Sequence, residues 1–147
     1  MEEITAGALA WMEKQAKADQ PFFLWYNSTA MHFRTHLADK NRGKSGQDDY
    51  SDRMVTHDEQ IGELRNKLDE LGIADNTIVM YSTDNGPQND TWPDGANTPF
   101  RMMKDTNWEG EDRTGPATSP AGVTVCHLSR IFLSDRSIRQ SHQNTRQ

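Results

Sequence analysis

The chain has 147 residues, a formal net charge of −6 and a mean hydropathy of −0.91. That length fits one domain, but 33% hydrophobic residues is a thin supply for a self-contained core. No apolar segment approaches the length that crosses a membrane, so we expect no membrane partner. The single cysteine, Cys126, excludes an internal disulfide. The acidic, amphipathic N-terminus is unlike a signal peptide, and the cellular location stays open.

Charge divides the chain near residue 111. Residues 1–111 contain 11 Lys and Arg against 20 Asp and Glu, whereas residues 112–147 contain 5 Arg, no Lys and 2 acids. A tail that is rich in Arg, Ser, Thr and Gln, with few core residues, is typical of disorder. A tail that binds nucleic acid is the alternative. Scattered arginines without interleaved aromatic residues support it weakly, so we expect no nucleic-acid partner.

The first 30 residues predict a helix followed by a strand. Apolar residues recur at near-helical spacing among Glu and Lys, namely Ile4, Ala8, Leu9, Trp11 and Met12. This helix should end near Asp19, because Pro21 disfavours a helical residue before it. The stretch PFFLWYN, residues 21–27, is too short for a buried helix and suits a buried strand.

A polar loop over residues 34–49 leads to a second helix. Its apolar residues share one helical face, namely Val55, Ile61, Leu64, Leu68 and Leu71. Gly72 suits the position just past the helix, and TIVMYS, residues 77–82, predicts a second short strand. A strand–helix–strand unit predicts parallel strands joined by a right-handed crossover. We therefore expect an α/β fold with a mostly parallel sheet and flanking helices.

Polar residues follow both predicted strands. The functional crevice of such a sheet lies beyond the carboxyl ends of its strands. His32 follows the first strand, and Asp84 and Asn85 follow the second. Both groups should therefore open onto the same edge of the sheet.

The sequence Asp84-Asn85-Gly86 has two interpretations. Asn-Gly is a strong hairpin signal, but residues 87–99 offer no alternating apolar run for a second strand. Alternatively, the carboxylate and the amide carbonyl supply two hard oxygen ligands for Ca²⁺ or Mg²⁺, and Gly86 lets the backbone turn sharply behind them. Two oxygens do not complete a calcium site, so further ligands must come from elsewhere. Spacing alone leaves both interpretations open.

Two further residues are candidates for chemistry. An exposed loop histidine or a lone lysine is ordinarily a solvated surface residue. Near the carboxyl edge of the sheet, however, His32 could donate a proton to a leaving group. The surroundings of Lys104 suggest an ordered loop, because they include Pro99, Phe100, Trp108 and Gly110. We interpret His36 and His57 as surface residues.

Three stretches together resemble the C-terminal part of a sulfatase catalytic domain of the bacterial arylsulfatase type. They are PFFLWYNSTAMHFRTH, HDEQIGELRNKLDELGIADNTIVMYSTDNG and TWPDGANTPFRMMKDTNWEG, all within residues 1–111. The order and spacing of the second stretch are highly specific. The resemblance implies a partial alkaline-phosphatase-like α/β fold and the hydrolysis of sulfate esters, with a small sulfate ester or a sulfated glycan as partner.

The resemblance also implies roles for single residues. Asp84 and Asn85 match the acid-amide metal ligands of the family, which usually hold Ca²⁺ and otherwise Mg²⁺. Lys104 matches the lysine that contacts sulfate, and His32 matches the histidine near the leaving-group oxygen, a general acid. The family nucleophile is a formylglycine, made from Cys or Ser in C/S-x-P-S-R, which attacks sulfur as its hydrated diol. Fixed cations and donors suit this chemistry, because charge spreads over the sulfate oxygens.

The chain departs from the family pattern in two places. Nothing before residue 20 matches the nucleophile motif, the aspartate pair or the Lys/His pair, so we expect formylglycine to be absent and the chain to be inactive alone. The run from Cys126 to Arg130 is a chance similarity to the nucleophile motif, because leucine replaces its proline and the run follows the metal pair. After Gly110 the family's second glycine and R-x-P run are missing, which indicates an out-of-frame reading.

These patterns predict a partial catalytic domain over residues 1–111 and a divergent basic tail over residues 112–147. Two alternative functions stay open. One is a phosphoester or phosphonate hydrolase of the same superfamily, although related phosphohydrolases tend to place histidine where this chain has Asn85. The other is a non-catalytic cation-binding or assembly module, which predicts stabilisation by calcium without turnover. Members of the family are often periplasmic or secreted, and the oligomeric state is open.

Overall fold

The computed structural model describes residues 2–93, 99–112, 117–119 and 129–135. Its helices are α1 (Glu2–Lys17), η1 (Asp39–Asn41), α2 (Asp49–Glu70), η2 (Ala74–Asn76) and α3 (Glu109–Asp112). Its strands are β1 (Phe23–Tyr26), β2 (Thr77–Thr83), β3 (Ala117–Ser119) and β4 (Ser129–Asp135). The two longer helices and the first two strands lie where the sequence predicts them. Among the described helices, none has the length and apolar composition to cross a membrane.

The four strands form one sheet in the order β1-β4-β2-β3, and each neighbouring pair is antiparallel. This arrangement differs from the predicted mostly parallel sheet. Strands β1 and β2 do run in the same direction, because each is antiparallel to β4 between them. The backbone N–H and C=O groups along the facing edges of β1 and β2 need hydrogen-bond partners. The backbone of β4, which contains the β-favouring run Ile131-Phe132-Leu133, supplies them.

Two of these strands lie within residues 112–147, where the sequence favours a mostly disordered tail. Strand β4 pairs with β1 over four residues and with β2 over seven. The structure places β4 between β1 and β2, and the predicted division of the chain at residue 111 stays a prediction. The candidate motif at Cys126 lies outside the described residues.

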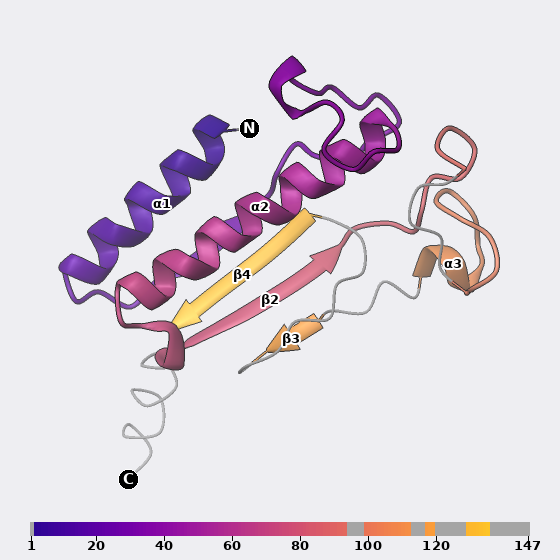
Figure 1. Cartoon of the computed structure of the whole chain (residues 1–147). Helices are drawn as coiled ribbons and strands as arrows, with labels where there is room; N and C mark the ends of the chain where they lie inside the picture. Colours follow the sequence, from indigo (N-terminus) through magenta and orange to yellow (C-terminus); the bar gives the residue numbers. More distant parts are fainter. Residues whose placement is uncertain (1, 94–98, 113–116, 120–128, 136–147) are drawn as a thin grey trace, which may run out of the picture.

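Helices α1 and α2 lie side by side on one face of the sheet (Figure 1). The core between these layers takes residues from α1, α2, β1 and β2 and from the residue before β1, namely Ala8, Met12, Phe22, Tyr26, Leu64, Leu68 and Tyr81. Side chains alternate along β1, so Tyr26 is buried whereas Phe23 and Trp25 are 54% and 49% exposed. The helices therefore bury one side of β1 only.

Helix α2 begins earlier than its apolar spacing predicts. The Asp48 side chain accepts a hydrogen bond of 2.7 Å from Ser51 N, which caps the helix one residue before Asp49. At the other end, Gly72 has φ +68°, as the predicted position just past a helix requires. The caps thus fix α2 so that its first turn, at Tyr50, lies beside the loops that leave β1 and β2.

Candidate functional site

A cavity of about 340 Å³ lies where the chain leaves β1 and β2. The four predicted site residues His32, Asp84, Asn85 and Lys104 all line it. The remaining lining comes from the same loops and from the start of α2, namely Ser28, Thr29, Ala30, Met31, Tyr50, Thr83, Gly86 and Gln88. The equal direction of β1 and β2 explains this grouping, because both strands deliver their following loops to the same edge of the sheet.

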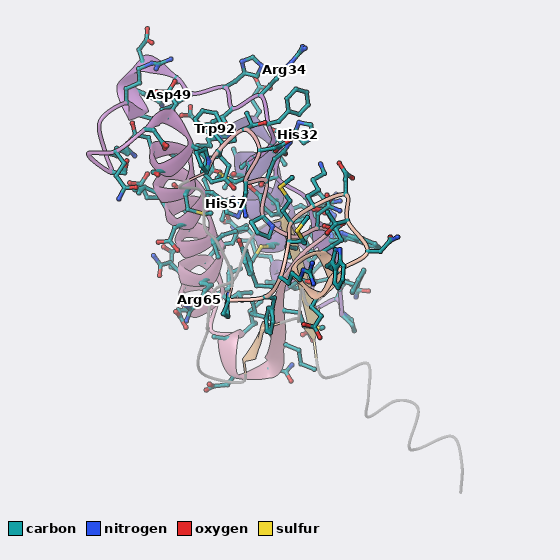
Figure 2. All side chains as sticks on the ribbon, turned by 90° about the vertical axis from the view of Figure 1, so that its right-hand side faces the viewer. His32, Arg34, Asp49, His57, Arg65 and Trp92 are labelled. Carbon is teal, nitrogen blue, oxygen red and sulfur yellow. The ribbon has the colours of Figure 1, made fainter. Side chains whose placement is uncertain are left out.

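His32 lies in the loop after β1 and is exposed. Its ring centroid is 4.5 Å from that of Phe33, and the preceding Met31 has φ +66°, which is uncommon for a residue with a side chain. The Trp92 indole N–H donates a 3.1 Å hydrogen bond to the Phe33 carbonyl, and the Trp92 and Tyr50 ring centroids are 5.4 Å apart. Trp92, from the loop after β2, therefore holds the His32 loop and itself packs against Tyr50 of α2. Figure 2 shows Trp92 and His32 in the same part of the molecule.

Asp84 and Asn85 follow β2 directly, with Asp84 exposed and Asn85 half-buried. The Thr83 hydroxyl donates to the Asn85 carbonyl at 2.8 Å, and the Asn85 side-chain Nδ2 donates to the Asp84 carbonyl at 2.8 Å. No strand follows within residues 84–93, so the Asn-Gly pair does not close a tight hairpin. Since Nδ2 donates within the protein, Oδ1 is the amide atom that remains for a ligand beside the Asp84 carboxylate.

Glu111 of α3 supports this loop, although the sequence pattern gave it no role. Its Oε2 accepts a 3.0 Å hydrogen bond from Gly86 N, and its Oε1 lies 3.4 Å from Asn85 Nδ2. A Cβ on Gly86 would lie 2.0 Å from the Gly110 carbonyl oxygen. Gly86 does not have a left-handed φ, so glycine is needed here for close backbone approach and not for the predicted sharp turn.

Lys104 enters the cavity from the loop before α3 and is half-buried. Its backbone N–H donates a 3.0 Å hydrogen bond to the Pro87 carbonyl, which joins its loop to the loop after β2. The neighbouring Met102 and Asp105 both have left-handed backbone conformations, with φ of +70° and +64°. Such backbone conformations cost free energy and persist only where surrounding contacts hold them. The backbone hydrogen bond from Lys104 to Pro87 is one such contact.

The prediction that His57 is a surface residue is wrong. Its exposed fraction is 2%, its Nδ1 lies 3.2 Å from Ser28 Oγ, and its Nε2 lies 3.2 Å from the Tyr81 hydroxyl. The sequence held a signal for this burial, because His57 is four residues before Ile61 and seven before Leu64 on one helical face. His57 therefore connects the cavity wall at Ser28 to the core at Tyr81.

The residues present fit part of a site for a hard cation. The Asp84 carboxylate and the Asn85 carbonyl oxygen are ligand types that Ca²⁺ and Mg²⁺ prefer, and they come from adjacent positions on one cavity wall. Over the part of the chain that the structure describes, no three or more His, Cys, Asp or Glu side chains group together to hold a metal ion. The chemistry of the donor set favours an oxygen-ligated cation over a transition metal.

Residues 1–116 match the family model described as Sulfatase. The chain is 34% identical over 126 residues to N-acetylgalactosamine-6-sulfatase from Homo sapiens, which covers 83% of this chain and 24% of that protein. It is 29% identical over 100 residues to arylsulfatase A from Homo sapiens, which covers 67% of this chain and 20% of that protein. With N-acetylgalactosamine-6-O-sulfatase from Bacteroides thetaiotaomicron it shares 38% identity over 69 residues, or 47% of this chain and 14% of that protein. The chain thus spans about a quarter or less of the length of these relatives.

Proposed function

The chain belongs to the sulfatase family, and we propose that it supplies the cation-binding and sulfate-binding wall of a sulfate ester hydrolase site. The observation that carries this proposal is the single cavity lined by His32, Asp84, Asn85 and Lys104. A carboxylate, an amide oxygen, an ammonium group and an imidazole at one cavity suit a tetrahedral anion whose ester bond is cleaved.

Each residue has a distinct part in this proposal. Asp84 and Asn85 would hold the cation, which when bound would neutralise negative charge on the sulfate oxygens. The Lys104 ammonium group would donate hydrogen bonds to a sulfate oxygen and fix the orientation of the ester. In a complete site, where a nucleophile supplied from outside these residues forms a bond to sulfur, His32 would give its proton to the ester oxygen as the S–O bond breaks and the alcohol leaves. His32 is exposed where it lines the cavity, so solvent and the leaving alcohol can reach it.

Glu111 has a positioning part in the same site. By accepting from Gly86 N and lying near Asn85 Nδ2, its carboxylate turns the amide so that Oδ1 is left for the cation. The calcium preference rests on the two hard oxygens, with Mg²⁺ as the other candidate. We propose that the chain alone binds without turnover, because no C/S-x-P-S-R motif for a formylglycine occurs in its 147 residues.

The substrate class is a sulfate ester carried by a small molecule or by a glycan. The names of two of the relatives, which specify a 6-sulfate of N-acetylgalactosamine, favour the glycan. A phosphoester or phosphonate hydrolase is the second candidate, and Asn85 at the metal site favours sulfate over it. A non-catalytic cation-binding module would share the calcium response but would not bind sulfate.

Calcium binding by this chain tests the metal part of the proposal. Calcium at about 100 times its Kd should stabilise the fold by about 2.7 kcal/mol, and differential scanning calorimetry would record the rise in Tm. Asp84→Asn should lose that rise, whereas Asp90→Asn, an exposed carboxylate outside the cavity lining, should keep it. An Asp84→Asn variant that responds like the unmodified chain would contradict the assignment.

Sulfate binding tests the anion part. With calcium present, isothermal titration with inorganic sulfate should give a Kd that rises about tenfold or more in Lys104→Met, since that variant loses a charge-assisted hydrogen bond. Tighter binding of inorganic phosphate than of sulfate would favour the phosphoester alternative. Calcium binding without either anion would leave the cation-binding module as the function.

A further inference from the structure

A second cavity, of about 510 Å³, adjoins the first and shares Thr29 and Met31 with it. Its floor consists of polar side chains that are at least nine-tenths buried, namely Asn41, Arg53, Thr56 and Gln60. Its rim is mostly charged or polar, and comprises Glu2, Glu3, Arg34, Thr35, His36, Ala38 and Lys40. A hydrophilic cavity of this volume is large enough for a sugar ring.

The Gln60 side chain places on the floor of the second cavity a hydrogen-bond acceptor that lacks a donor among the described residues. The residue is 5% exposed, and its Oε1 accepts no hydrogen bond within the described ranges. Thr56, one helical turn earlier, satisfies its own hydroxyl by donating to the Asp52 carbonyl at 3.0 Å. A buried acceptor that is left unpaired costs free energy, which a ligand hydroxyl donating to Gln60 Oε1 would recover.

The charges around the cavity favour an anion. Arg53 is 8% exposed, and burial lowers the pKa of its guanidinium, so a nearby anion would stabilise its charged form. Arg34 is exposed at the rim, whereas Lys40 forms an ion pair with Glu2. Glu3 is the other acid of the lining, and His36 is an exposed imidazole. In the lining as a whole, the cations Arg34, Lys40 and Arg53 outnumber the acids Glu2 and Glu3.

The two cavities are placed for one extended ligand. Thr29 and Met31 form their common wall, and Met31 has the left-handed φ of +66°. His32 and Arg34, on opposite sides of Phe33 in the chain, line the first and second cavity respectively. Figure 2 shows both near the end of the molecule at which α2 begins, with Arg65 toward the other end.

We infer that the second cavity is a saccharide subsite for a sugar unit that carries an anionic group, next to the sulfated unit in the first cavity. The inference rests on the proposed function for the link between the cavities. In the subsite the anionic group lies against Arg34 and Arg53, and a ring hydroxyl donates to Gln60 Oε1. The protein thereby selects acidic sulfated glycans over neutral ones.

Titration of the chain with monosaccharides, followed by NMR, tests this inference. Glucuronic acid provides a carboxylate, glucose 6-sulfate a sulfate, and glucose neither. The two anionic sugars should bind at least about tenfold more tightly than glucose. The substitutions Arg34→Gln and Gln60→Leu should each raise the Kd for the anionic sugars about tenfold. Arg65→Gln, an exposed arginine farther along α2, is the matched control and should not change it.

The outcomes separate the subsite from the sulfate site. Binding of glucuronic acid that survives Asp84→Asn but falls in Arg34→Gln supports the subsite, even if inorganic sulfate fails to bind at the first cavity. Equal affinity for glucose and the anionic sugars would overturn the inference. An affinity for the anionic sugars that is unchanged in Arg34→Gln would also overturn the inference. Arg34 is exposed, so this substitution does not disturb the core.

Discussion

At the residue scale, the Asp52 carboxylate holds the polar loop that precedes α2. Its Oδ1 accepts from the Ser45 hydroxyl at 2.6 Å and from Ser45 N at 2.7 Å, and its Oδ2 accepts from Gly43 N at 2.5 Å. The Ser45 hydroxyl, then the Ser45 and Gly43 N–H groups, lower the pKa of Asp52 from its ordinary value of 3.8. The ionised form of Asp52 therefore stabilises the folded chain.

This contribution predicts a pH dependence. Because the folded pKa of Asp52 is lowered, its stabilisation is present above the unfolded pKa and is lost as pH falls through the folded value. The Tm of the unmodified chain should exceed that of Asp52→Asn at pH 6, and the difference should shrink below about pH 4. Calorimetry across pH measures it, with exposed Asp58→Asn as the control at pH 6. A difference that grows toward acid pH would contradict the role given to the Asp52 contacts.

At the element scale, the loop after β2 and helix α3 depend on two glycines. A Cβ on Gly86 would meet the Gly110 carbonyl oxygen at 2.0 Å, and a Cβ on Gly110 would meet the Met102 carbonyl oxygen at 2.1 Å. Backbone atoms are the obstacles in both cases, so a side-chain rotation cannot relieve them. The position of Glu111 beside Asn85 follows from this close packing.

Two glycine substitutions should therefore act in opposite directions. Gly86→Ala should separate α3 from the loop, reduce stability by about 1–3 kcal/mol and weaken calcium binding. Gly62→Ala, inside α2 with nothing within 4 Å of the added Cβ, should stabilise by about 0.5–1 kcal/mol and leave calcium binding unchanged. Urea unfolding and calcium titration measure both effects. Equal stability of Gly86→Ala and the unmodified chain would show that the close approach is dispensable.

At the scale of the whole molecule, β4 lies between β1 and β2, two strands that come from distant parts of the chain. Figure 1 shows β4 beside β2. It pairs Tyr26 of β1 and Tyr81 of β2 with the same residue, Ile131. Without β4, the backbone edges of β1 and β2 would face each other across an empty strand position. The sheet that carries both cavity loops is thus completed from the C-terminal segment.

Removal of residues 117–147 tests that arrangement. The shortened chain should lose the pairing of both strands with β4, lower its Tm by roughly 5 °C or more, and aggregate through the exposed edges. Thermal unfolding and sedimentation velocity measure these effects. A shortened chain that keeps the Tm and remains monodisperse would mean that β4 adds nothing, and would support the sequence-based expectation of a disordered tail.

The sequence by itself predicted the four longest local elements before the tail and named four of the residues that line the first cavity, namely His32, Asp84, Asn85 and Lys104. Helical periodicity, Gly72 and the two apolar runs depend on contacts between near neighbours, so they predicted α1, α2, β1 and β2. The order of these elements along the chain also predicted that His32 and Asp84 lie at the same edge of the sheet. That prediction requires only that β1 and β2 run in the same direction. Only the tertiary structure decided the insertion of β4, the side chains that His57 contacts and the contact of Glu111 with Gly86. Each of these joins residues that are at least 24 positions apart, a separation that no periodic pattern along the chain records.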